Sequence, residues 1–99
     1  MIVSLVFFSL TSTAFAELNV DVIVDGLSNP WEIVFAPGGE IYFTERDGRL
    51  WLIEEFGQAK VIETFPKSSS VEGGTLGLAL HPAFEENKKI YIYQLLTHF

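Results

Sequence analysis

Apolar and polar side chains alternate with a period of two over much of the chain, a pattern typical of β-strands. The clearest series is LNVDVIV at residues 18–24, and later runs are rich in the β-branched and aromatic residues that strands favour. Helix signals are weak, and only residues 83–88 could form one turn of helix. The pattern predicts strands over residues 18–24, 31–35, 40–46, 49–54, 59–65, 75–80 and 90–93.

Residues that form tight turns separate these strands. Pro37-Gly38-Gly39 follows one expected strand, and Asp47-Gly48 lies between two apolar runs. An Asp-Gly pair in this setting is a strong signal for a hairpin with a two-residue turn. Both central residues of such a turn need positive φ, which we therefore expect of Asp47 and Gly48.

Two stretches share one pattern: a short apolar strand, a proline turn and a second strand that begins with Ile-Tyr. The first runs from Trp31 to Thr44 and the second from Leu76 to Tyr93. A repeat of about 40–50 residues is typical of β-propellers, with one four-stranded blade per repeat. The sequence therefore predicts an all-β fold, with a first blade over about 31–65 and the start of a second over about 75–93.

A propeller closes with about 4–8 blades, and this chain has room for fewer than two. We therefore expect a β-propeller fragment of about one and a half blades within residues 17–99. Residues 18–24 would be an extra strand, of the kind that completes the last blade of a closed propeller. An isolated blade exposes apolar faces and strand edges, so we expect aggregation or partial unfolding unless the chain assembles.

Residues 1–16 differ in kind from the rest of the chain. An apolar run from Ile2 to Leu10 precedes Ala14-Phe15-Ala16, which fits a small-x-small cleavage pattern. These features predict a signal peptide over residues 1–16, cleaved after Ala16, and export to the periplasm or the extracellular space. The segment has no Lys or Arg, and an uncleaved anchor is the alternative. The run is shorter than the ~20 residues of a spanning helix, so we expect no stable membrane span.

Composition and charge exclude several classes of function. Hydrophobic residues make up 48% of the chain, too many for a disordered protein. The formal net charge is −7, whereas binding of nucleic acid requires clustered Lys and Arg, so we expect no nucleic-acid partner. Because the chain has no cysteine, it can form neither a disulfide nor a zinc–thiolate site.

Three motifs occur in order: GLSNPW at 26–31, TERDGRL at 44–50 and EGGTLGLALHPAF at 72–84. Together they resemble the amino-terminal part of the glucose/sorbosone dehydrogenase family, which includes soluble dehydrogenases that use pyrroloquinoline quinone (PQQ). The resemblance covers about residues 20–93. It implies a six-bladed propeller and an exported enzyme with PQQ and calcium, which oxidises the anomeric carbon of an aldose to a lactone. In that family a histidine base takes the hydroxyl proton while hydride passes to the quinone.

The resemblance transfers one site residue. In soluble glucose dehydrogenases a glutamine precedes an Asn-Gly-Leu-Leu-Gly stretch and reaches the cofactor pocket, and Glu72 has the matching position before Gly73-Gly74. Glu72 is therefore the candidate for cofactor binding. A carboxylate there would repel the acidic groups of PQQ unless a proton or a cation intervened, so a solvated loop glutamate is the alternative. The family's catalytic histidine, calcium ligands and most cofactor-binding residues correspond to positions beyond residue 99.

The two histidines have simple structural interpretations. His81 precedes Pro82 at a strand end, where we expect local hydrogen bonds rather than a role as base or ligand. His98 lies next to the carboxyl terminus and is expected to be frayed. The serines at 68–70 have no partnering base and are interpreted as a linker.

The remaining candidates are charged and aromatic side chains. Arg46 and Asp47 would form either an ion pair lining the channel or an exposed hairpin pair. Trp31 and Trp51 could stack on a sugar, but we expect core positions for tryptophans within a blade. Acidic residues that lack the spacing of a calcium loop are Asp21, Asp25 and Glu32.

The sequence favours a fragment of an exported PQQ-dependent aldose dehydrogenase that lacks the catalytic histidine and is inactive alone. Its expected partners are an aldose sugar and either the missing blades or further copies of the chain. The alternative is a non-catalytic propeller that serves as a binding or interaction module, or a pseudogene remnant, because fold does not determine function.

Overall fold

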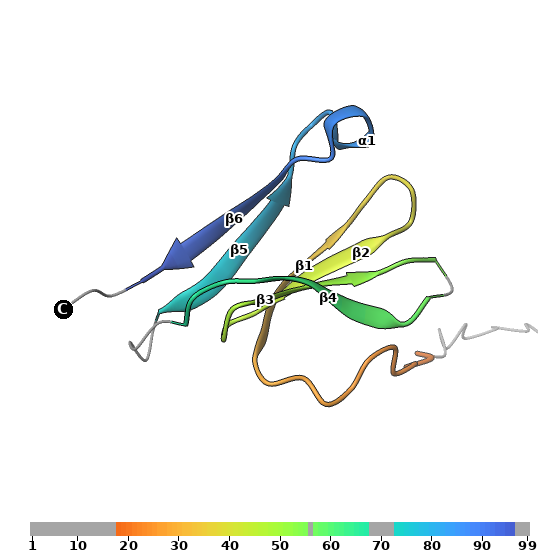
Figure 1. The fold of residues 1–99 in the computed structure, drawn as a ribbon. Helices are drawn as coiled ribbons and strands as arrows, with labels where there is room; N and C mark the ends of the chain where they lie inside the picture. Colours follow the sequence, from red (N-terminus) through yellow and green to blue (C-terminus); the bar gives the residue numbers. More distant parts are fainter. Residues whose placement is uncertain (1–17, 56, 68–72, 97–99) are drawn as a thin grey trace, which may run out of the picture.

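The computed structural model describes residues 18–55, 57–67 and 73–96, and this part of the chain is almost entirely antiparallel β-sheet (Figure 1). The first sheet has the strand order β1 (Pro30–Phe35), β2 (Ile41–Glu45), β3 (Arg49–Ile53) and β4 (Ala59–Thr64). The second sheet pairs β5 (Gly74–Leu80) with β6 (Ile90–Leu95), and the helical turn α1 (Phe84–Asn87) connects them. The strands expected between 31 and 65, the second pair and the turn of helix are thus observed.

The two faces of the first sheet have different neighbours, because side chains alternate along each strand. The face toward β5 carries Tyr42, Thr44 and the residues in register with Tyr42, and we call it the forward face. The opposite face, which we call the rear face, carries Ile33 paired with Phe43 and Phe35 paired with Ile41. Both faces are largely apolar, as a sheet layered between two others requires.

The second sheet lies against the forward face of the first. Leu78 pairs with Ile92, and both side chains point toward the first sheet. We call this face of β5 and β6 the rear face of the second sheet. The ring of Phe84 in α1 is buried and meets Tyr42 edge to face, with centroids 5.6 Å apart. Tyr91 and Tyr93 point the other way and form an exposed forward face. The hydrophobic core of the two sheets consists of Ala36, Phe43, Leu50, Leu52, Ile53, Leu78 and Phe84.

Residues 18–24 do not form the strand that their alternating pattern predicts. They cross the rear face as an extended segment, and Leu18 at its start is 91% exposed. A strand needs a neighbour for its backbone hydrogen bonds, and none of the described strands lies alongside this segment. The prediction is therefore wrong for these residues, because alternation alone cannot supply the partner.

The turn between β2 and β3 also differs from the prediction. It has three residues, 46–48, and the Gly48 N–H donates to the carbonyl of Glu45 at 3.0 Å. Of these residues only Gly48 has positive φ, at 118°, so the positive φ expected of Asp47 is wrong. Arg46 belongs to the loop rather than the strand, because its backbone bonds with residues outside the hairpin. A three-residue loop with glycine at the left-handed position is the next most common hairpin after the two-residue forms.

The described residues include no helix long and apolar enough to cross a membrane, since α1 is a single turn.

We predict that Gly48→Ala lowers the free energy of unfolding by about 3 kcal/mol or more. A Cβ at this position would lie 2.3 Å from the carbonyl oxygen of Phe65, whose N–H donates to Gly48. Gly39→Ala is the matched control, because Gly39 also has positive φ but its Cβ would meet nothing within 4 Å. That variant should lose only about 1–2 kcal/mol from its backbone conformation. Urea denaturation followed by circular dichroism measures both, and equal losses would contradict the steric argument.

Candidate functional site

Three connections meet at one end of the two sheets: the residues before β1, the β2–β3 turn and the start of β5 (Figure 1). Arg46 joins them. Its N–H donates to the carbonyl of Asn29 at 2.9 Å, and its own carbonyl accepts from the Thr75 N–H at 3.1 Å. Its Nε donates to the carbonyl of Gly73 at 2.9 Å. Glu72, the sequence-based candidate for cofactor binding, lies outside the described residues, but the residue after it is held by Arg46.

Gly74 allows the two sheets to approach closely at this end. Its φ is 129°, and a Cβ there would lie 2.3 Å from the carbonyl oxygen of Arg46. Only glycine accommodates both the backbone conformation and the contact. The second glycine of the EGG motif therefore has a packing role, independent of any ligand.

Thr44, next to Arg46, makes a further contact between the two sheets. We call the contacts of Thr44 and Arg46 with residues 73–76 the joint. Its buried hydroxyl donates to the carbonyl of Leu76 at 2.8 Å and accepts from the Glu32 N–H at 3.3 Å. On the second sheet, the buried Thr75 hydroxyl accepts from the side-chain amide of Gln94 at 3.0 Å. These bonds satisfy polar groups that would otherwise be costly to bury.

Glu45 is a buried charged residue at this end of the sheets, and it is not among the candidates predicted from the sequence. Its side chain is 0% exposed. One carboxylate oxygen accepts from the Ser28 N–H at 2.5 Å, and the other accepts from Trp51 Nε1 at 2.5 Å. The Nε of Arg49 lies 3.1 Å from the second oxygen. A carboxylate with this set of donors is suited to fixing the surrounding loops.

A signal for Glu45 was present in the alternation. The rear face of β2 carries Ile41, Phe43 and then Glu45, so a carboxylate ends an otherwise apolar series. Its register partner is Arg49 across the hairpin. An acid on an apolar face opposite an arginine predicts a buried ion pair.

The ion pair expected between Arg46 and Asp47 is not observed. Asp47 instead accepts from Arg49 Nη2 at 2.7 Å. This hydrogen bond is the largest cause that raises the pKa of Arg49 above its ordinary value. Burial, followed by the carboxylates of Glu40 and Glu54, raises the pKa of Tyr42. Both groups therefore stay protonated through the neutral range.

His81 forms the local hydrogen bonds expected of a turn histidine. Its Nδ1 accepts from the Ala83 N–H at 2.9 Å, with Asn87 Nδ2 also at 2.9 Å, and its ring stacks on Tyr91. His98 and the serines at 68–70 lie outside the described residues.

The two tryptophans have different environments. Trp51 stacks on the core residue Phe43 with ring centroids 5.6 Å apart, but Trp51 itself is half-buried rather than in the core. Trp31 is more than half exposed, so its expected core position is wrong. The register of β1 is irregular between Pro30 and Ile33, which removes Trp31 from the regular pairing.

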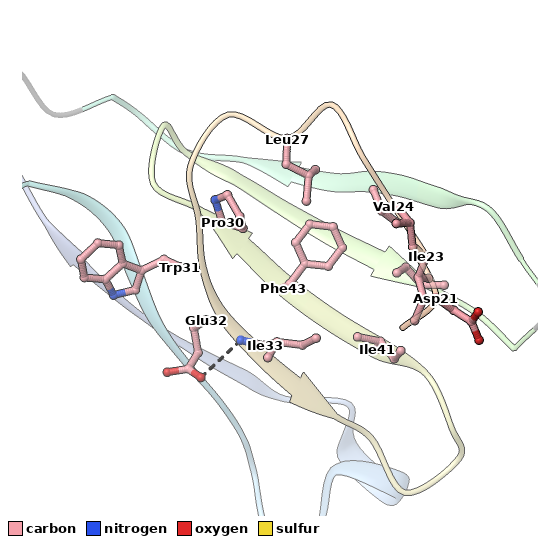
Figure 2. A pocket seen from close by; sticks show the side chains of 12 residues that line it. Asp21, Ile23, Val24, Leu27, Pro30, Trp31, Glu32, Ile33, Ile41 and Phe43 are labelled. Carbon is pink, nitrogen blue, oxygen red and sulfur yellow. Dashed lines mark hydrogen bonds between the residues drawn. The ribbon is translucent and has the colours of Figure 1, made fainter. Parts of the chain in front are cut away.

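A hollow of about 490 Å³ lies on the rear face, beneath the leading segment, which we define as residues 18–29. Figure 2 shows Ile33, Ile41 and Phe43 of the sheet opposite Leu27 and Val24 of that segment. Its walls are mostly apolar. It offers packing surface rather than a set of polar groups that could orient a sugar.

The described residues contain no group of three or more His, Cys, Asp or Glu side chains that could hold a metal ion.

Comparison with known proteins gives consistent matches. The family profile described as Glucose / Sorbosone dehydrogenase matches residues 27–98. An uncharacterised protein of Synechocystis is 34% identical over 85 residues, covering 76% of this chain and 21% of that protein. Quinoprotein glucose dehydrogenase B of Acinetobacter calcoaceticus is 33% identical over 93 residues, covering 84% of this chain and 20% of that protein.

A solved structure matches as well. A Thermus thermophilus protein described as an oxidoreductase (glucose dehydrogenase) superposes with a TM-score of 0.70 at 36% identity. The match covers 77% of this chain and 23% of that one. The chain thus spans about a fifth of the length of the relatives it matches, with 21% and 20% of the two sequence relatives covered.

We predict that Glu45→Gln destabilises the fold by about 1–3 kcal/mol, because the new amide NH₂ must face a buried donor. Glu54→Gln is the matched control. Glu54 also pairs with a cation, Lys60 at 3.3 Å, but both side chains are exposed, so its loss should cost less than about 1 kcal/mol. Chemical denaturation measures the free energy of unfolding of both variants. An equal loss in the two would contradict the claim that burial makes Glu45 important for stability.

Proposed function

Because the chain belongs to the glucose/sorbosone dehydrogenase family, we propose that it forms the first blade and a half of an exported, PQQ-dependent enzyme that oxidises an aldose sugar. The family match over residues 27–98 includes the second and third motifs in full and the first motif without Gly26. The family of this chain is one of oxidoreductases with a β-propeller fold. Its specific substrate, cofactor and export are our proposal.

One observation carries this proposal: the end of the sheets at which Arg46 is hydrogen-bonded to Gly73 and Thr75. Loops at the end of a rigid scaffold are where binding and catalytic residues gather. The loop that contains Glu72 begins at β4 and returns to the sheet at this joint. Glu72 would thus border a ligand held above the joint.

The described residues fit a supporting role toward the cofactor. PQQ, when bound, supplies the two-electron acceptor for hydride from the anomeric carbon of the sugar. Glu72 would lie beside its acidic groups, which the Glu72 carboxylate would repel. A calcium site does not fit the described residues alone, because no three suitable ligands converge there. We derive no step through calcium from this chain.

The described residues also lack a free catalytic histidine. His81 Nδ1 already accepts from the Ala83 N–H, and no carboxylate hydrogen-bonds to this ring in the described part of the chain. We therefore place proton abstraction on a residue of another blade. Export is supported by the apolar run and cleavage pattern of residues 1–16.

We predict that this 99-residue chain alone, supplied with PQQ, calcium, glucose and an artificial dye acceptor, gives no turnover. Transfer of residues 17–96 into quinoprotein glucose dehydrogenase B, in place of its matching segment, should retain PQQ-dependent glucose oxidation. Dye reduction measures both. Turnover by the chain alone, or a folded chimera with no activity, would contradict the proposal.

We further predict that Glu72→Gln in that chimera lowers the dissociation constant for PQQ several-fold, because a repulsive carboxylate becomes a neutral hydrogen-bonding amide. Titration of the apo-chimera with PQQ, followed by tryptophan fluorescence, gives the constant. Glu85→Gln in α1, an exposed glutamate on another connection, is the control and should leave it unchanged. An identical constant for Glu72→Gln would assign Glu72 to solvent.

A further inference from the structure

Trp31 is exposed although the strands next to it are both part of the described structure. Its exposed fraction is 58%, while β1 pairs with β2 on one side and lies beside β5. The sequence left two roles open for this tryptophan, a place in the core or stacking on a sugar. Because the structure removes the first role, the second remains.

The backbone at Trp31 departs from regular pairing and exposes two neighbouring side chains together. Trp31 and Glu32 oppose the single residue Thr44, so β1 has one extra residue at this point. Both side chains are exposed, and Figure 2 shows both on the side of β1 that points away from Phe43. An extra residue of this kind is a β-bulge, a feature that re-aims side chains and occurs often beside active sites.

The second copy of the repeat has the same irregularity without these side chains. The prolines of the two copies lie 45 positions apart, so Trp31 and Glu32 correspond to Leu76 and Gly77. The register of the second sheet shifts at this same place. The bulge can therefore be built with neither an indole nor a carboxylate, and the fold alone does not account for Trp31 and Glu32.

The bulge is anchored at the end of the sheets where the candidate site lies. Before it, the carbonyl of Asn29 accepts from the Arg46 N–H at 2.9 Å. After Trp31, the Glu32 N–H donates to the hydroxyl of Thr44 at 3.3 Å, and that hydroxyl donates to a carbonyl of β5. The backbone of Trp31 is thus fixed between two residues that form the joint.

We propose that Trp31 and Glu32 form a binding subsite for the pyranose ring of an aldose, an inference that rests on the proposed function. A pyranose with equatorial hydroxyls has an apolar face of C–H groups, which packs on the flat face of an indole. One oxygen of Glu32 accepts from the Ile33 N–H at 3.2 Å, and the carboxylate has further lone pairs for sugar hydroxyls. An aromatic surface with a few placed polar groups is the usual composition of a small-molecule site.

A sugar that cannot be oxidised tests this subsite apart from catalysis. The full chain, isotope-labelled, is titrated with methyl β-D-glucopyranoside, whose anomeric oxygen is blocked, and the two indole N–H signals are followed by NMR. The Trp31 signal, identified by its loss in Trp31→Phe, should shift in a saturable way with a millimolar dissociation constant. The Trp51 signal is the internal control and should not move, because its Nε1 donates to the buried carboxylate of Glu45. Sorbitol, a polyol without a ring, should move neither signal.

Substitutions separate the indole from exposed aromatic surface in general. Trp31→Ala should raise the dissociation constant for the glucoside about tenfold, measured by saturation transfer to the sugar, whereas Trp31→Phe should retain part of the affinity. Phe35→Ala removes another exposed aromatic side chain, on the rear face, and should leave the constant unchanged. Glu32→Ala should raise the constant several-fold through loss of hydrogen bonds. An unchanged constant in Trp31→Ala, or an equal loss in Phe35→Ala, would overturn the subsite.

The chimera with quinoprotein glucose dehydrogenase B provides a second measurement if the chain does not fold alone. There Trp31→Ala should raise KM for glucose about tenfold and leave kcat within about twofold, because stacking on the ring stabilises substrate and transition state alike. Trp31→Phe should restore part of KM. An active chimera in which Trp31→Ala leaves KM unchanged would overturn the subsite and leave the proposed function standing. A chimera that binds the glucoside through Trp31 but oxidises no glucose would contradict the proposed function alone.

Discussion

The buried carboxylate of Glu45 is the interaction on which the end of the first sheet depends. Its charge is removed from water, so its three donors must stay in place or the uncompensated burial would cost several kcal/mol. Those donors come from the leading segment at Ser28 and from β3 at Trp51 and Arg49. The carboxylate therefore fixes the chain that enters β1 against the hairpin that follows β2. Because side chains alternate, the residues on either side of Glu45 face the second sheet or contribute backbone atoms to it.

Three consecutive residues, Thr44, Glu45 and Arg46, thus hold three parts of the molecule together. Thr44 bonds to β5, Glu45 bonds to the leading segment and β3, and Arg46 bonds to the chain before β1 and to the start of β5. This is the end of the sheets to which the loop containing Glu72 returns.

The sequence predicted the strands well and the long-range polar contacts poorly. Local alternation and turn residues were sufficient for β1 to β6, because each hairpin is specified by neighbouring residues. The same alternation was wrong for residues 18–24, since a strand also requires a partner that local sequence does not reveal. The role of Arg46 depends on Asn29 and Gly73, which are distant in the chain, so a pairing with adjacent Asp47 was the wrong expectation. Glu45 was missed for a similar reason, although its place on an apolar face opposite Arg49 was a usable signal. Sequence reasoning named Glu72 by resemblance alone.

The chemistry of the joint also explains how relatives at 33–36% identity can keep this arrangement. On the β5 side, the groups that receive Thr44 and Arg46 are the backbone atoms of Leu76, Gly73 and Thr75. Backbone donors and acceptors are present whatever side chain occupies the position, so substitutions in β5 leave these bonds intact. Gly74 is the exception, because any side chain there would meet the carbonyl of Arg46. On the β5 side the joint therefore constrains the identity of one residue, Gly74, while it fixes the backbone from Gly73 to Leu76 against the first sheet.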